Sequence, residues 1–334
     1  MIVTTKNNAE TLGECVHSIL KLNYPKAKLR VLILDASSNQ STRNALAGLP
    51  VEIVQYASNA PAAYNFGLRT VESEIVGFVD ADAKVDHNWL AEITKHLNDK
   101  QVAGAAGAMR TWNSQSLIPR CIGYELESRY NNPKKVIRAS TTNLVLKRAA
   151  IEEVGGFDET LDTGYDADIG FRIDDLGYRI VFEPEAIVYH FHRPAFLSYW
   201  KQQYHYAKND AKLYSKNSGL ILNDNVTRKW MLAQPILVLS FVLSSLILLI
   251  LHVTSLSSHR TTIELVTTTW LGFGLILTGS CLFTSARLAF SAHEPAAWPV
   301  LFCILVTRAV AWTIGGLVGL VQDSLPRVPI VWRR

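Results

Sequence analysis

The sequence is poor in cysteine and carries little net charge. Its four cysteines, Cys15, Cys121, Cys281 and Cys303, include no C-x-x-C pair. They are therefore interpreted as reduced and incidental thiols, which suits a cytosolic face. The formal net charge is only +4 over 334 residues. So small an excess of basic residues argues against a nucleic-acid partner.

Charged residues become scarce after Trp230, where long apolar runs begin. Residues 231–251, 265–283 and 298–321 are each long enough to cross the hydrocarbon core of a bilayer. Only the third run contains a charge, Arg308, and a charge at that depth is expected to face protein or water. The sequence therefore predicts a globular part followed by a membrane part.

The globular part alternates strand patterns with helix patterns. Apolar runs predict strands over residues 2–5, 29–34, 51–56, 75–79, 143–146, 178–182 and 186–189. Helical spacing and helix-start signals predict helices over residues 11–20, 59–71, 148–154 and 169–176. This order is typical of an α/β fold with a mostly parallel sheet, which binds ligands beyond the carboxyl ends of its strands. One crevice can then collect Thr5, Asp35 and Asp80, which stand at such ends.

The fourth predicted strand ends in Asp80-Ala81-Asp82. On an extended chain the outer two residues of a triplet point the same way. Two carboxylates at a strand end can hold one divalent cation, Mg²⁺ or Mn²⁺, between themselves and a diphosphate. The alternative interpretation is a solvated acidic turn.

Several successive segments resemble the family 2 inverting glycosyltransferases: T-T-K-N-N, V-L-I-L-D-A-S-S-N, N-A-P-A-A-Y-N-F-G-L and F-V-D-A-D. The resemblance implies a GT-A fold, which is a Rossmann-like nucleotide-diphospho-sugar transferase domain, and a nucleotide-sugar donor. It implies that Asp35 contacts the nucleobase, Asp80 the ribose or the metal, and Asp82 the metal on the diphosphate. The remaining donor-binding residues that it implies are Thr4, Thr5 and Lys6. Many relatives carry a basic residue where this chain has Tyr64, so the identity of the donor stays open.

A later segment, G-G-F-D-E-T-L-D-T-G-Y-D-A-D-I-G-F-R-I, resembles the acceptor-side block of the same family. In that block an acidic residue at the start of a helix is the catalytic base. The resemblance assigns this role to Asp166 and prefers it over Asp168. Both acids alternatively only cap the following helix. His190 and His192 follow at a strand end, where surface imidazoles are favoured over metal ligands.

Residues 199–206, Y-W-K-Q-Q-Y-H-Y, partly resemble the Q-Q-x-R-W motif of processive polysaccharide synthases. Because Tyr206 and His205 replace the tryptophan and the arginine, processivity is not expected. Lysines and aromatic residues alternate around this segment, which favours a helix at an anionic membrane surface. A solvated amphipathic helix is the alternative.

The combined prediction is a membrane-bound, metal-dependent glycosyltransferase. Residues 1–194 are predicted to form a GT-A domain, 195–230 a membrane-interface segment, 231–322 the transmembrane region and 323–334 a tail. The order of these parts is similar to that of succinoglycan-biosynthesis-type glycosyltransferases. The resemblance implies a single displacement that moves a sugar from a nucleotide-diphosphate sugar to a lipid-linked or other saccharide acceptor.

Basic residues determine the predicted topology. Arg228 and Lys229 precede the first span and place the catalytic domain on the cytoplasmic side of a multi-pass cell-membrane protein. Three full spans would then carry Arg327, Arg333 and Arg334 outside, against this tendency. The third apolar segment is alternatively re-entrant or lies on the surface.

Two other functions remain as alternatives. The segment A-A-Y-N-F-G is similar to polyprenyl- and dolichyl-phosphate sugar synthases, although these lack the G-G-F-D-E block. An inactive nucleotide-sugar-binding membrane subunit is the alternative from another class. The joint presence of Asp35, Asp80, Asp82 and Asp166 argues against inactivity.

Overall fold

The computed structural model describes residues 1–131, 133–253 and 260–324. The chain forms two compact units. The first, called here the sheet unit, contains Met1–Ala195 and Gly219–Thr227. The second, the helical unit, contains Phe196–Ser218 and the chain from Arg228 onward. Arg327, Arg333 and Arg334, on which the predicted topology partly depended, lie outside the described residues.

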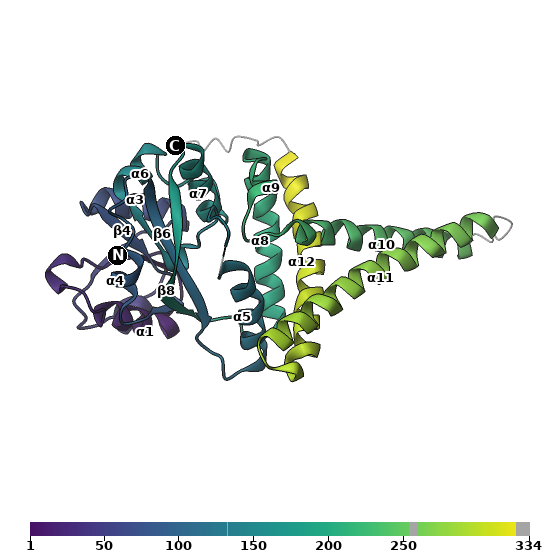
Figure 1. The fold of residues 1–334 in the computed structure, drawn as a ribbon, viewed down its shortest axis with the longest axis horizontal. Coiled ribbons are helices and arrows are strands. Elements are labelled where there is room, and N and C mark those ends of the chain that lie inside the picture. The colour runs from purple at the N-terminus through teal and green to yellow at the C-terminus, as the bar shows by residue number, and fades with distance from the viewer. Residues whose placement is uncertain (132, 254–259, 325–334) are drawn as a thin grey trace. The chain divides into compact units, whose positions relative to one another are not determined.

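The sheet unit is built on an eight-stranded sheet with the order β3-β2-β1-β4-β7-β6-β8-β5. Figure 1 labels β4, β6 and β8 of this sheet. The strands are β1 (Ile2–Thr5), β2 (Leu32–Asp35), β3 (Glu52–Gln55), β4 (Ile75–Phe78), β5 (Ala83–Val85), β6 (Val102–Thr111), β7 (Leu144–Lys147) and β8 (Arg179–His190). Strands β1 to β4 pair in parallel, and β6 and β8 are parallel to each other. Strand β7 is antiparallel to β4 and β6, and β5 is antiparallel to β8. The predicted α/β class is confirmed.

Helices cover both faces of this sheet. They are α1 (Ala9–Leu20), α2 (Ser41–Ala45), α3 (Ala60–Thr70), α4 (Trp89–Ile93), α5 (Leu117–Tyr130), α6 (Arg148–Glu153), α7 (Tyr165–Asp175) and α9 (Leu220–Asn223). Alternate strand residues point to opposite faces, so Val3 and Ile33 pack with α1 and α4. Ile2 and Leu32 pack with α3, α6 and α7 on the other face. Strands β1 and β2 are thus buried on both sides, as in parallel sheets, whereas the edge strand β3 is partly exposed.

Three parts of the sheet differ from the sequence-based expectation, and one of them is the short strand β5, which was not predicted. The strands predicted over 178–182 and 186–189 form one strand, β8, whose register with β6 shifts between Gly107 and Met109. Strand β6 was not predicted, because its alanines and glycines have low strand propensity. Its Gly107 leaves no room for a side chain, since a Cβ there would collide with the Ala186 carbonyl oxygen.

The helical unit contains α8 (Phe196–Lys216), α10 (Lys229–Val253), α11 (Arg260–Ser291) and α12 (Trp298–Ser324). Helices α10, α11 and α12 are long and apolar enough to cross a membrane, which agrees with the three predicted apolar segments. A membrane protein is therefore supported by length and composition.

Candidate active site

The acidic residues after β4 meet the end of β8. The chain turns at Asp80 into β5, whose Ala83 pairs with His190, the last residue of β8. Asp80, Asp82 and His190 each offer one ligand atom, and these atoms lie within 4.8 Å of one another. The Asp82 Oδ1 atom is 3.4 Å from His190 Nε2. Two carboxylates and one imidazole form a donor set that suits Mn²⁺ or Mg²⁺ better than a thiol-rich site would.

The sequence favoured a surface role for His190, but the structure brings it into this cluster. The side chains of His190 and Asp82 are each only 16% exposed. His192 lies behind, with its Nδ1 atom 3.1 Å from that of His190. The spacing H-x-H at a strand end was the only sequence signal, and it could not reveal which acids the strand would meet.

The charges of Asp80, Asp82 and His190 influence one another's pKa. Burial, together with the charge of Asp82, raises the pKa of Asp80 to about 6. Burial alone would also raise the pKa of Asp82, but His190 and Arg193 hold it below its usual range. Asp80 Oδ2 accepts a hydrogen bond of 2.5 Å from Thr142 Oγ1. A cation bound between the carboxylates would relieve the repulsion that contributes to the raised pKa of Asp80.

A second set of polar atoms lies at the ends of β1 and β2. Thr5 pairs with Asp35 across the two strands, and both residues are buried. Asp35 Oδ1 accepts a hydrogen bond of 2.8 Å from the Ser37 backbone N–H. Asp35 Oδ2 and Thr5 Oγ1 are buried without a hydrogen-bond partner among the described residues. Because an unpaired buried polar atom is costly, these two atoms fit a bound polar ligand.

The neighbouring residues of β1 complete this region. Thr4 Oγ1 donates to the Tyr64 hydroxyl at 3.3 Å. Lys6 is exposed, and Asn7 has a left-handed φ of 57° and donates its N–H to Ser37 Oγ. The structure thus brings Thr5 and Asp35 together directly, with Thr4 and Lys6 beside them in the chain.

Tyr64, at the position where many family members carry a basic residue, is a core residue. Its ring lies 5.1 Å from Phe78, 5.2 Å from Phe157 and 5.9 Å from Tyr165, measured between centroids. Burial raises the pKa of its hydroxyl, so the phenol stays neutral. Tyr64 therefore supplies no positive charge at this position.

Asp166 lies in the first turn of α7, after Gly164, whose φ of 74° is left-handed. Its Oδ1 accepts a hydrogen bond of 2.8 Å from the Ala167 N–H. Burial raises its pKa, although the positive charge of Arg138 acts in the opposite direction. The charge of Asp166 contributes to the raised pKa of Asp80. Asp166 is therefore electrostatically coupled to the acidic cluster.

Asp168, two residues later, has a structural environment. It is 3% exposed, and its Oδ2 accepts two hydrogen bonds from Arg172, at 2.9 and 2.6 Å. Arg172 also donates to the carbonyl oxygens of Val154 and Gly156. Arg172 thus links Asp168 in α7 to the chain that follows α6. The role of Asp168 is therefore to stabilise the packing of these two helices.

Residues 219–227 contribute a contact that sequence reasoning missed. Asn225 Oδ1 accepts the backbone N–H groups of Ile137 and Arg138, at 2.8 and 2.7 Å. Asp224 Oδ2 pairs with Arg138 Nη2 at 3.0 Å. The segment therefore fixes Arg138, whose charge lowers the pKa of Asp166.

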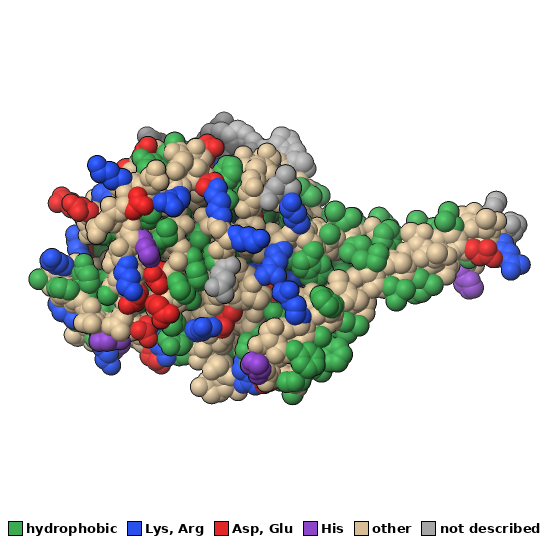
Figure 2. All heavy atoms as spheres, viewed as in Figure 1, with side chains coloured by type: hydrophobic (Ala, Val, Ile, Leu, Met, Phe, Trp, Pro, Cys, Tyr) green, Lys and Arg blue, Asp and Glu red, His purple; other side chains and the backbone are tan. Residues whose placement is uncertain are grey.

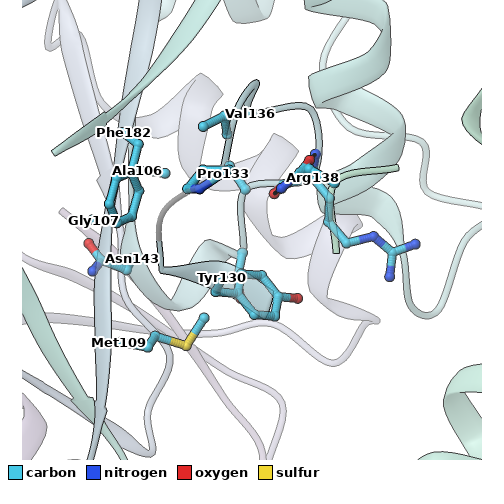
Figure 3. Close-up of a pocket in the computed structure, with 12 residues that line it drawn as sticks. Ala106, Gly107, Met109, Tyr130, Pro133, Val136, Arg138, Asn143 and Phe182 are labelled. Atoms are coloured by element: carbon cyan, nitrogen blue, oxygen red, sulfur yellow. Dashed lines mark hydrogen bonds between the residues drawn. The ribbon is translucent and has the colours of Figure 1, made fainter. Parts of the chain in front are cut away.

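Arg138 also borders a small pocket between β6, Tyr130 and residues 133–140 (Figure 3). Phe182 and Ala106 lie on one side of this pocket, and the Arg138 guanidinium points away from them (Figure 3). The Tyr130 hydroxyl points toward the same side as Arg138. Burial raises the pKa of Tyr130, so this hydroxyl stays a neutral hydrogen-bonding group.

The first 155 residues match the family model described as glycosyl transferase family 2. The pre-mycofactocin glycosyltransferase of Mycobacterium tuberculosis is 28% identical over 252 residues, which cover 70% of this chain and 52% of that protein. Glycosyltransferase AglE of Haloferax volcanii is 26% identical over 223 residues, covering 64% of this chain and 73% of that protein. The match thus spans only about half the length of the mycobacterial relative.

Among solved structures, a mannosyltransferase from Pyrobaculum calidifontis in complex with GDP-Man and Mn²⁺ is similar in fold. Its TM-score is 0.59 at 19% identity, and the match covers 93% of this chain and 85% of that chain. Residues 1–155 thus match glycosyl transferase family 2, and the sheet unit has a GT-A-like fold.

Proposed function

We propose that this chain transfers a sugar from a nucleotide-diphosphate sugar to a lipid-linked saccharide, with inversion at the anomeric carbon and with help from a divalent cation. The observation that carries the proposal is the convergence of Asp80, Asp82 and His190 beyond the ends of β4 and β8. This edge of the sheet also holds Asp35, at the end of β2, with an unpaired buried oxygen.

The donor nucleotide is proposed to bind at the ends of β1 and β2. Asp35 Oδ2 can accept an N–H of the nucleobase, and the Thr5 hydroxyl can pair with a second polar group of the nucleoside. Thr4 and Lys6 line the same end of β1, where the Lys6 ammonium suits a phosphate. The Pyrobaculum calidifontis mannosyltransferase of similar fold was solved in complex with GDP-Man and Mn²⁺, which supports a nucleotide-sugar donor.

Asp80, Asp82 and His190 are proposed to hold Mg²⁺ or Mn²⁺ beside the diphosphate. A cation bound there would neutralise the charge that develops on the departing nucleoside diphosphate. Asp80 is additionally held by the hydroxyls of Thr141 and Thr142, at 3.3 and 2.5 Å. These hydrogen bonds fix the orientation of its carboxylate before a ligand binds.

Asp166 is proposed to act as the general base. The acceptor hydroxyl oxygen forms a bond to the anomeric carbon while the bond to the diphosphate oxygen breaks on the opposite face, which inverts the configuration. The bonding electrons leave with the diphosphate, and the hydroxyl proton passes to the Asp166 carboxylate. A pKa raised by burial makes this carboxylate a stronger base than an exposed aspartate.

The acceptor is proposed to be carried by the membrane that the apolar helices enter. Arg228 and Lys229 at the start of α10 favour a cytoplasmic sheet unit. An O-antigen chain rhamnosyltransferase of Salmonella anatum is 27% identical over 211 residues, which cover 58% of this chain and 65% of that protein. Its name supports a role in building surface polysaccharide.

The test uses full-length protein in lipid nanodiscs, with a panel of nucleotide sugars, Mn²⁺ or Mg²⁺, and either polyprenyl phosphate or lipid-linked saccharide as acceptor. We expect radiolabelled sugar to enter the lipid-extractable saccharide in the wild type and not in Asp82→Asn. Asp175→Asn changes an exposed acid on α7 and serves as the control. Labelling of polyprenyl phosphate alone would identify a sugar-phosphate synthase, and thermal stabilisation without transfer to any acceptor would identify a binding subunit.

A further inference from the structure

Helix α12 packs against α8 within the helical unit. Trp312 Nε1 donates to Gln203 Oε1 at 3.0 Å, and Ser215 Oγ donates to Asp323 Oδ2 at 2.9 Å. Both helices therefore run in the same direction over this stretch. Between these two contacts the backbones approach closely.

Glycines make this close approach possible. A Cβ at Gly315 would collide with the Tyr204 carbonyl oxygen, and one at Gly319 would collide with that of Lys208. Small side chains of α8, Ala207 and Ala211, face the same two glycines. Helices α8 and α12 thus form one tightly packed pair, called here the paired helices.

Helix α8 is unsuited to the hydrocarbon core. It carries Lys201, Lys208, Lys212 and Lys216. A lysine at the centre of a membrane helix is costly to insert. If α12 crossed the bilayer, α8 would have to accompany it and bring these lysines along. Of the most apolar stretch of α12, 50% is buried inside the protein. The corresponding share is 11% for α10 and 6% for α11.

Helices α10 and α11 have the opposite character. They form an antiparallel hairpin in which Gln234 lies beside Cys281, and Ser245 beside Trp270. The 20 or so residues from Gln234 to Val253 rise ~30 Å, which matches the thickness of the hydrocarbon core. Large apolar side chains are exposed along both helices, and Figure 2 shows apolar side chains on the surface of the hairpin.

Two side-chain contacts join α12 to the hairpin, and both lie near the start of α10 and the end of α11. Arg308 Nη2 lies 3.4 Å from Gln234 Oε1, near the start of α10. Trp298 Nε1 donates to Ser285 Oγ at 2.9 Å, near the end of α11. Arg308 is therefore placed at the level where α10 enters the membrane, and its charge does not need to reach the bilayer centre.

We propose that the chain crosses the bilayer twice, as α10 and α11, and that the paired helices lie in the membrane surface. The lysines of α8 then face lipid phosphate groups, while the exposed apolar residues of α12 enter the headgroup boundary. Two crossings return the chain to the side from which it started. The end of α12 therefore lies on the same side as the sheet unit, and the start of α11 lies on the other side.

The sidedness of three engineered thiols tests this topology. The full-length chain first receives Cys303→Ser, because Cys303 is an exposed cysteine. Single cysteines are then introduced at exposed positions in the sheet unit, at the start of α11 and at the end of α12, as Asp175→Cys, Arg260→Cys and Gln322→Cys. Each variant is treated in intact cells and in inverted vesicles with a membrane-impermeant maleimide, and the Cys303→Ser parent gives the background from the buried Cys15, Cys121 and Cys281.

We expect Asp175→Cys and Gln322→Cys to be labelled from one side and Arg260→Cys from the other. Labelling of Gln322→Cys together with Arg260→Cys, opposite Asp175→Cys, would mean that α12 crosses the bilayer and would overturn the proposal. Labelling of all three from one side would mean that the hairpin does not cross, which would overturn it equally.

Depth is measured separately with a fluorophore on Val310→Cys, an exposed position in the middle of α12. A helix in the membrane surface is quenched more strongly by nitroxide lipids labelled at the headgroup than by lipids labelled near the chain end. The reverse order would place the middle of α12 at the bilayer centre and would contradict the proposal. Neither measurement depends on transferase activity.

Discussion

Asp166 and Asp168, in the first turn of α7, are predicted to respond differently to the same substitution. Asp166→Asn removes the proposed base but keeps a side chain that accepts hydrogen bonds at a helix start. We expect turnover to fall by at least ~100-fold with little change in nucleotide affinity or melting temperature. Steady-state transfer at saturating donor, together with nucleotide titration and thermal melting, measures all three.

Asp168→Asn provides the comparison, although the structure changes what should be expected of it. Its carboxylate is 4% exposed in an ion pair with Arg172, and breaking a buried pair costs ~3–5 kcal/mol. The melting temperature should therefore fall, whereas turnover of the protein that stays folded should change little. If Asp168→Asn lowered turnover without lowering the melting temperature, and Asp166→Asn did not lower turnover, the assignment of the base to Asp166 would be wrong.

Arg138 should control the pH dependence of the reaction. Because a general base must be deprotonated, turnover should rise with pH through the raised pKa of Asp166. Arg138 holds that pKa down, so Arg138→Gln should raise it further and move the acidic limb of the turnover profile to higher pH. The measurement is turnover against pH at saturating substrates. An acidic limb that persists unchanged in Arg138→Gln would contradict this coupling.

The proposed metal site predicts graded losses. Asp82→Asn replaces an anionic ligand by a neutral amide and should abolish metal-dependent nucleotide binding. His190→Ala should weaken binding of Mn²⁺ while leaving activity that excess Mn²⁺ partly restores. Calorimetric titration with Mn²⁺ in the presence of nucleoside diphosphate compares both with the wild type. Undiminished wild-type activity in EDTA would remove the cation from the mechanism.

At the scale of elements, strands rich in branched residues were predicted well. Strand β1 was predicted with its observed bounds, and β4 ends one residue before the predicted end. Strand β6 could not be predicted, because burial between neighbours stabilises its Ala-Gly sequence in place of intrinsic propensity. Local motifs likewise identified Asp35, Asp80 and Asp82 as candidates, since they follow strands in the sequence.

Long-range contacts were beyond the sequence. His190 joins the acidic cluster only because β8 pairs with β5. The contact of Asp224 with Arg138 joins residues 86 positions apart, a separation that no local pattern encodes. Pattern and motif reasoning thus identifies residues at strand ends, whereas strand order decides which of them meet.

The glycines of α12 provide a matched pair for testing the packing of the paired helices. Gly319 faces the α8 backbone, whereas a Cβ at Gly316 would meet nothing within 4 Å among the described residues. Gly319→Leu should destabilise the helical unit by at least the ~1–3 kcal/mol typical of overpacking, and Gly316→Leu should be nearly neutral. Melting temperatures in detergent measure both. Equal effects would mean that α8 does not pack against this face of α12.

At the scale of the whole molecule, anchoring should matter for membrane-bound acceptors alone. A chain that ends after Thr227 keeps all of the sheet unit and should bind nucleotide normally. Its transfer to a lipid-linked acceptor should fall, because enzyme and acceptor are no longer confined to one surface. Transfer to a water-soluble acceptor analogue should change much less. Equal rates on the lipid-linked acceptor with and without residues 228–334 would give the helical unit another role.

A chain that ends after Ser218 should be less stable than the chain that ends after Thr227, because it also loses Asp224 and Asn225. These residues hold Arg138 and its neighbouring backbone. Its melting temperature should fall below that of the chain ending after Thr227, because the backbone N–H groups of Ile137 and Arg138 lose their hydrogen bonds to Asn225. Equal melting temperatures would contradict this stabilising role.

The return of residues 219–227 to the sheet unit limits how such enzymes can be recombined. The two units share three junctions along the chain, at 195/196, 218/219 and 227/228. A single crossover between two homologous genes at the first junction would combine one parent's Arg138 with the other parent's residues 219–227. A chimera that joins the sheet unit of one parent to the helical unit of another should therefore take residues 219–227 from the same parent as the sheet unit.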